Sequence, residues 1–239
     1  MFIFKKSKIV LDCFTSNKNV LEFTPIDKAI KFYPEWLKNT PKFLDKTFYP
    51  ASTIKNCTGI IDYYKQGFMI PLWTDLSINV QNRSYQWQFA DYKSEAKEHN
   101  SAQWDTYVSA QNYGHLKLIS PFKIISKNDI DFHFTKPFWN FEPKSSYYIP
   151  SGNVNYKYNH STEINMFIDL TENKVINIDL GTPLAHIIPL TDKEVILKHH
   201  LISDEEYKNL PVIHTFVNSY SKYKKLVQNK ESKCPFGFK

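Results

Sequence analysis

The sequence predicts an α+β fold that is mainly antiparallel β. It would have a sandwich or jelly-roll-like body, short helices around it and a helical C-terminal segment. Segments rich in β-branched and aromatic residues recur along the first two thirds of the chain, and their apolar positions alternate. Helical signals are fewer and concentrate near the C-terminus. The 239 residues therefore suit a β-rich domain over 1–200, with a helical segment over 201–239 packed on it and ending in a basic tail.

The strands are predicted from β-branched and aromatic runs bounded by turn residues. They cover residues 7–15, 68–80, 84–90, 116–125 and 130–135. The clearest element is a pair of alternating segments, EINMFIDL (163–170) and KVINIDL (174–180), joined by the turn-like TEN. We expect these two to form an antiparallel hairpin with one buried face that ends at Leu180.

Four helices are predicted from caps and spacing. Residues 57–67 form a short helix that can end on Gly67, a residue that readily adopts the left-handed conformation of a C-terminal cap. Residues 191–200 and 203–210 each begin with the spacing of a capping box, a Thr or Ser followed three residues later by Glu. Residues 215–228 place aromatic and aliphatic side chains at helical intervals.

The charge pattern argues against specific nucleic-acid reading. The net charge is +6, but Arg83 is the only arginine, and arginine is the usual residue for bidentate recognition of guanine and phosphate. The lysines are scattered apart from 5–8 and 222–233, which is typical of a solvated face and a basic tail. A homo-oligomer is left open.

Sequence motifs exclude several further classes. No glycine-rich phosphate loop of either common type occurs, and the three cysteines have no C-x-x-C spacing, which favours a reducing compartment without disulfides. No apolar run reaches the roughly 20 residues that cross a bilayer, and the N-terminus does not read as a secretory signal. We therefore expect a cytoplasmic protein that does not contact a membrane.

Three residues are candidates for ligand binding, and no catalytic residue is predicted. Trp73 and Asp75 are expected on one face of a strand, where an aromatic ring beside a carboxylate can form a pocket wall. His186 lies between two apolar runs and is expected in the core, bonded to an ordinary partner. No metal or cofactor is predicted. A metal site would require distant histidines, His115, His133 and His186, to converge.

Four segments occur in an order that resembles a known family. They are TIKNCTGIIDYYKQGFMIPL (53–72), HLKLISPFKI (115–124), NMFIDL (165–170) and GTPLAHIIPL (181–190). The order is similar to that of a family of phage and bacterial proteins of unknown function, and the likeness covers residues 53–190. It implies a phage-encoded protein and supplies no catalytic residue. A lysine-rich, arginine-poor composition suits an AT-rich phage genome.

The leading hypothesis is a phage-encoded, non-catalytic accessory protein in the host cytoplasm. It would bind a small ligand or another protein through an aromatic-lined face of a β-sandwich. One alternative is a metal-dependent oxygenase or isomerase on a cupin-like barrel. The other alternative is a structural component of the virion.

Overall fold

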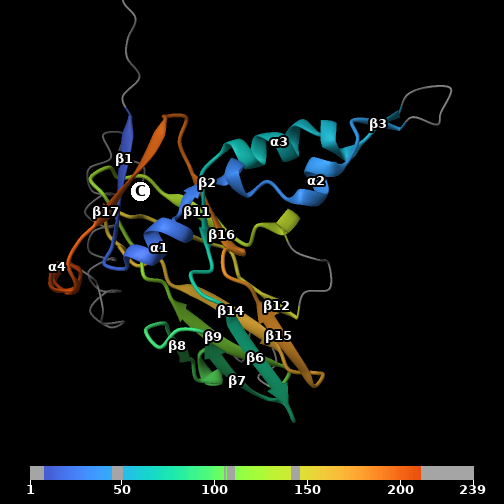
Figure 1. Cartoon of the computed structure of the whole chain (residues 1–239), viewed down its shortest axis with the longest axis vertical. Coiled ribbons are helices and arrows are strands. Elements are labelled where there is room, and N and C mark those ends of the chain that lie inside the picture. Colours follow the sequence, from blue (N-terminus) through green and yellow to red (C-terminus); the bar gives the residue numbers. More distant parts are fainter. Residues whose placement is uncertain (1–7, 45–50, 105, 107–110, 141–145, 211–239) are drawn as a thin grey trace, which may run out of the picture.

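The computed structural model describes residues 8–44, 51–104, 106, 111–140 and 146–210. Over these ranges the chain is mostly antiparallel β-sheet with a few short helices, which confirms the predicted β-rich α+β class (Figure 1). The predicted helix 215–228 and the basic tail 222–233 lie outside the described residues.

Two sheets form the half of the molecule that carries the N-terminal strand (Figure 1). The first sheet has the order β10 (Lys123–Ser126), β1 (Ile9–Thr15), β17 (Val195–Leu201). The second has the order β13 (Gly152–Val154), β11 (Phe132–Thr135), β16 (Pro183–Pro189), β5 (Phe68–Pro71), β2 (Asp27–Lys28).

Two more sheets build the opposite half, around β6 and β9. One has the order β12 (Tyr147–Tyr148), β14 (Ile164–Asp169), β9 (Tyr113–Ile119), β8 (Glu95–Glu98). The other has the order β15 (Lys174–Ile178), β6 (Leu76–Gln81), β7 (Ser84–Phe89). A small ribbon of β3 (Phe43–Leu44) and β4 (Ala51–Ser52) stands apart from them.

The four larger sheets share one apolar core. Alternation along the strands turns Leu11, Ile78, Leu116 and Phe132 inward, and these four side chains are fully buried in a single cluster. Burial of this alternating face is the main favourable term that holds the sheets together. Alternating apolar positions in the sequence therefore identify the strands that bury one face in this core.

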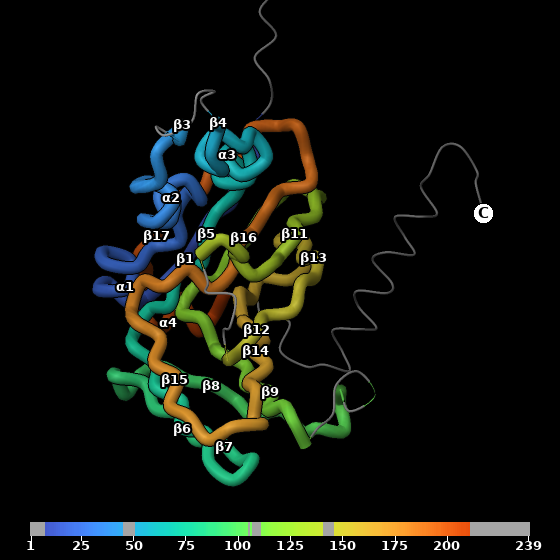
Figure 2. Tube along the Cα trace, turned by 90° about the vertical axis from the view of Figure 1, so that its right-hand side faces the viewer, coloured from blue at the N-terminus to red at the C-terminus, as the bar shows by residue number. Residues whose placement is uncertain are grey.

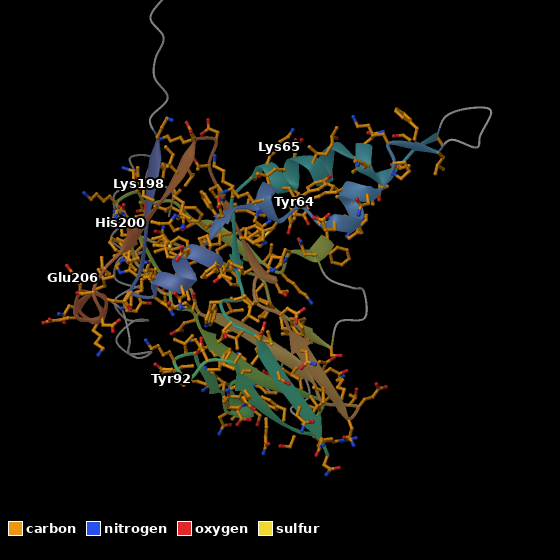
Figure 3. The ribbon with its side chains drawn as sticks, in the orientation of Figure 1. Tyr64, Lys65, Tyr92, Lys198, His200 and Glu206 are labelled. Atoms are coloured by element: carbon orange, nitrogen blue, oxygen red, sulfur yellow. The ribbon has the colours of Figure 1, made fainter. Side chains whose placement is uncertain are left out.

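Short helices gather mostly at one end of the molecule, beside β5 (Figure 2). In chain order they are α1 (Lys18–Phe23), η1 (Ala29–Phe32), α2 (Glu35–Asn39), η2 (Ile54–Asn56), α3 (Thr58–Lys65), η3 (Ser101–Gln103), η4 (Phe138–Asn140) and α4 (Asp204–Asn209). We call η1, α2, η2, α3 and η4 the helical lobe. It has its own core of Ala29, Leu37, Ile60, Tyr64 and Met69, and Figure 3 shows Tyr64 among its helices.

Two helix signals are confirmed. The helix predicted over 57–67 is α3, and Gly67 follows it with φ +69°, in the left-handed region. The capping box of 203–210 is complete, because Ser203 accepts from the Glu206 amide and Glu206 accepts from the Ser203 amide. The described part of the predicted C-terminal helical segment is thus α4.

The predicted hairpin of 163–170 and 174–180 is wrong. Both strands exist as β14 and β15, but β14 pairs with β9 and β12 whereas β15 pairs with β6. The turn between them carries the chain from one sheet to the other, and Leu180 is half exposed instead of buried. Each strand buries its apolar face in the shared core from a different sheet, which the alternation alone cannot distinguish.

The helix predicted over 191–200 is also wrong. This segment turns and then forms β17, which pairs in parallel with β1 from Ile9–Val195 to Thr15–Leu201. His199 and His200 are therefore strand residues; the His200 ring stacks on Phe14 and bonds to Asp12. The β-branched pair Val195 and Ile196 suits a strand and outweighs the capping-box spacing.

Candidate functional site

Trp73 lines a cavity, but not on a strand as predicted. The strand predicted over 68–80 is broken into β5 and β6, and Trp73 lies in the bend between them. Its buried indole N–H donates to the Ser94 hydroxyl at 3.0 Å. The cavity has a volume of about 480 Å³ and lies against Lys18, Lys93 and the N-terminal half of α4. Because the Trp73 N–H is already bonded, only its ring faces a ligand there.

Asp75 and His186 lie elsewhere. The exposed Asp75 carboxylate accepts from the Leu180 backbone amide at 2.6 Å, a bond that fastens β6 to the residues leading into β16. His186 is fully buried on β16, where its Nε2 donates to the Gln66 carbonyl at 2.7 Å and its ring packs edge-on against Tyr63. The structure does not bring Trp73, Asp75 and His186 into one cavity.

A different group of side chains forms a row across the sheet of β12, β14, β9 and β8. Tyr148 stacks on Phe167 with ring centroids 5.1 Å apart, and Phe167 stacks on His115 at 4.6 Å, both with ring planes 9° apart. His115 in turn lies 4.7 Å from the ring of His99, just past the end of β8. The strand register explains the row, because Tyr148, Phe167 and His115 are direct cross-strand neighbours.

His115 is held in one orientation by its neighbour on β14. Its Nε2 lies 3.1 Å from the Asn165 side-chain oxygen, so Nε2 carries the proton and donates. The other ring nitrogen, Nδ1, is buried and has no hydrogen-bond partner. Burial lowers the pKa of His115, and the nearby charges of His99 and Lys117 lower it further. At neutral pH, Nδ1 is therefore a bare acceptor.

Trp104 covers this row from the end of η3. Its ring meets Phe167 edge-on at 5.4 Å and His115 at 6.3 Å between centroids. The residue is 8% exposed, and its indole N–H is buried without an acceptor. A buried donor and a buried acceptor on two contacting rings are thus both unsatisfied, and each such group costs about 1–3 kcal/mol.

These two rings line a cavity of about 480 Å³, which we call the His115 cavity. Its lining includes residues of β7 and β9, strands that lie near one end of the molecule (Figure 1). Its rim carries Arg83 from the β6–β7 turn, Glu98 from the end of β8, and Tyr113. Burial raises the pKa of the Tyr85 hydroxyl in its wall, and the Glu98 carboxylate beside that hydroxyl raises it further. The volume falls in the range of small-molecule sites.

The three histidines considered for a metal site each have a ring nitrogen within hydrogen-bond distance of a side-chain amide or backbone carbonyl oxygen. His115 bonds to Asn165, His133 Nδ1 lies 3.0 Å from the Asn153 side-chain oxygen, and His186 bonds to a backbone carbonyl. Within residues 8–210, gaps excepted, no group of three or more His, Cys, Asp or Glu side chains could hold a metal ion. No helix of the same ranges is long and apolar enough to cross a bilayer.

The sequence did hold one sign of the His115 cavity. In INMFID the alternation turns Asn165, Phe167 and Asp169 to one face, so Phe167 is an aromatic ring on a polar face and needs a cover. Its partner could not be identified without the pairing of β14 with β9. The helical turn η3, which brings Trp104 over the row, is too short to show a hydrophobic periodicity.

No model of a protein family matches the chain, and a search of curated proteins found no significant match. The function must therefore be argued from the site itself.

Proposed function

We propose that the protein is a non-catalytic accessory protein that binds a small polar ligand in the His115 cavity. The observation that supports this most directly is the pair of unsatisfied groups on contacting rings, the Trp104 indole N–H and His115 Nδ1. A ligand group that accepts from the first and donates to the second would remove both penalties at once. A hydroxyl or a carboxamide has both capacities.

The lining of the cavity favours binding over catalysis. The residues that line it carry one guanidinium, one carboxylate, several hydroxyls and flat rings, which are groups that hydrogen-bond to or stack on a ligand. His115 is oriented by Asn165, and no carboxylate or nucleophilic side chain of the described residues bonds to it, so the nucleophile–histidine–carboxylate arrangement of covalent catalysis is not formed there. A metal-dependent oxygenase or isomerase is less well supported, because His115, His133 and His186 bond to amides and a carbonyl.

The wider setting is part of the same proposal. The sparse cysteines and the lysine-rich composition favour a cytoplasmic, phage-encoded protein. An accessory role inside an infected cell is compatible with a cavity of metabolite size. Nothing in the arrangement of the described residues favours a virion component over this role.

A ligand screen tests the binding function. The full chain is incubated with a panel of small polar metabolites, and its melting temperature and native mass spectrum are recorded. We expect at least one compound to bind and raise the melting temperature, since a ligand that binds only the folded state stabilises it. Trp104→Phe keeps the ring but removes the N–H, and should weaken that binding about tenfold or more.

Trp36→Phe is the matched control, because Trp36 lies on α2 of the helical lobe and does not line the His115 cavity. It should leave binding unchanged. If no compound binds, or if Trp104→Phe binds as tightly as the wild type, the proposed function is overturned.

A further inference from the structure

We propose that the ligand of the His115 cavity is an α-amino acid with a carboxamide or hydroxyl side chain. Its carboxylate would pair with Arg83, its ammonium with Glu98, and its side chain with Trp104 and His115. This inference rests on the proposed function and adds the chemical class of the ligand. Three features of the cavity carry it, one for each group of the ligand.

The first feature is the placement of Arg83. It occupies the second position of the two-residue turn between β6 and β7, which closes at the Gln81–Ser84 pair. Asn82 and Arg83 have φ of 52° and 59°, the conformation of a type I′ turn, in which glycine is strongly preferred at the second position. The only arginine of the chain therefore occupies a position where its own backbone conformation is unfavourable, and this residue lines the His115 cavity.

Asn173 fixes this turn from the outside, because its side-chain oxygen accepts from the Asn82 amide at 2.9 Å. The guanidinium itself makes no ion pair within the described residues. An exposed guanidinium with a fixed backbone and a free fork of donors suits a carboxylate, which it can bind through two parallel hydrogen bonds.

The second feature is the opposite charge on another wall. The Glu98 carboxylate, exposed at the end of β8, lines the same cavity and likewise has no cationic partner in the described part of the chain. Arg83 and Glu98 form no ion pair with each other. A cavity that offers one separate cation and one separate anion is complementary to a zwitterion, whereas a simple anion or cation would leave one charge without a partner.

The third feature is the pair of buried, unsatisfied atoms on Trp104 and His115. The Trp104 N–H donates and His115 Nδ1 accepts, which matches the carbonyl oxygen and the amino group of a carboxamide, or the single oxygen of a hydroxyl. Both atoms are closed off from solvent, so binding as proposed requires the Trp104 indole to move aside when the ligand side chain enters. An apolar side chain would leave both groups unsatisfied, and the site would reject it.

Calorimetric titration of the full chain tests the ligand class. The probes are L-glutamine, L-asparagine, L-serine and L-threonine. For the best of the four, analogues lack one group each: for glutamine these are 4-aminobutanamide without the carboxylate, glutaramate without the amino group, and norvaline without the amide. We expect saturable binding of at least one probe below about 10 mM, with each deletion weakening it about tenfold or more.

Three variants assign the groups to residues. Arg83→Gly should weaken binding of the amino acid about tenfold but leave the carboxylate-free analogue unaffected, and Glu98→Gln should do the same for the amino group. Arg83→Gly also relieves the turn, so its stability should rise and loss of binding cannot be ascribed to unfolding. Lys97→Gln and Glu95→Gln, on the same strand but outside the cavity, are the matched controls.

Failure of the inference is distinguishable from failure of the proposed function. If another small molecule binds in a Trp104-dependent manner while none of the four amino acids binds, the ligand class is overturned and the binding function stands. The ligand class is also overturned if the amino acid binds but Arg83→Gly and Glu98→Gln leave its affinity unchanged.

Discussion

At the residue scale, His186 shows how a polar side chain is used within an apolar strand. It pairs across strands with Met69, so it faces the helical lobe, whereas its neighbours Ala185 and Ile187 face the main core. Its Nε2 is satisfied by Gln66, and its Nδ1 is buried without a partner. Protonation would place a charge and a new donor where no acceptor exists, and burial lowers the pKa of His186 from 6.5 to about 4.

This predicts an acid-sensitive stability with a defined window. The unfolded chain takes up a proton on His186 near pH 6.5, but the folded chain does so only near pH 4, so stability is full above pH 6.5 and falls as the pH drops toward 4. The loss from this residue is at most about 3 kcal/mol. His186→Leu should lose about 1 kcal/mol at pH 7, from the bond to Gln66, but should be less sensitive to acid.

Urea denaturation at pH 7 and near pH 4.5 measures both effects. His160→Gln is the control, because His160 is a partly exposed loop residue. If His186→Leu loses as much stability as the wild type over this pH range, another group causes the acid sensitivity.

At the element scale, the sequence predicted which segments are strands better than which strands pair. Alternation placed β1, β6, β7, β14 and β15 correctly, because each buries one face in the core. The pairing of β14 and β15 was wrong because a short turn also suits a step between packed sheets. The His115 cavity depends on the pairing of β14 with β9, which the sequence pattern does not reveal, so the cavity could not be predicted.

Gly67 illustrates what an element boundary can require. It ends α3 with φ +69°, and a Cβ built there would lie 2.0 Å from the carbonyl oxygen of Ile187 on β16. Glycine thus serves both the turn and the close approach of the chain to the neighbouring strand. Gly67→Ala should cost more than 3 kcal/mol or prevent folding, because strained backbone and steric overlap add up.

Two other glycines separate the cost of the positive φ from the cost of the steric contact at Gly67. Gly181 has φ +83° but open space around its Cβ position, so Gly181→Ala should cost only about 1 kcal/mol. Gly152 has neither a positive φ nor a neighbouring atom within 4 Å of its Cβ position, and Gly152→Ala should be neutral or slightly stabilising. Chemical denaturation of the three variants ranks them; equal losses at Gly67 and Gly181 would show that the contact with Ile187 carries no cost.

At the scale of the whole molecule, one strand separates two cores. β5 is buried on both faces: Phe68 and Ile70 belong to the core shared by the large sheets, and Met69 belongs to the helical lobe. The lobe core is small and built from short helices, whereas the main core draws on four sheets. Regions with fewer buried apolar contacts open at lower free energy, so the lobe should be able to unfold locally.

Leu37→Ala tests this division. Leu37 is fully buried in the lobe core, so its truncation should destabilise the lobe by about 2–5 kcal/mol. Hydrogen exchange followed by mass spectrometry should then speed up in α2 and α3, while amides of β6 and β7 exchange as in the wild type. Ile78→Ala, fully buried in the main core, should instead speed up exchange in both regions, because the lobe rests on β5 and β5 rests on that core. Faster exchange in β6 and β7 of Leu37→Ala would mean that the two cores unfold as one cooperative unit.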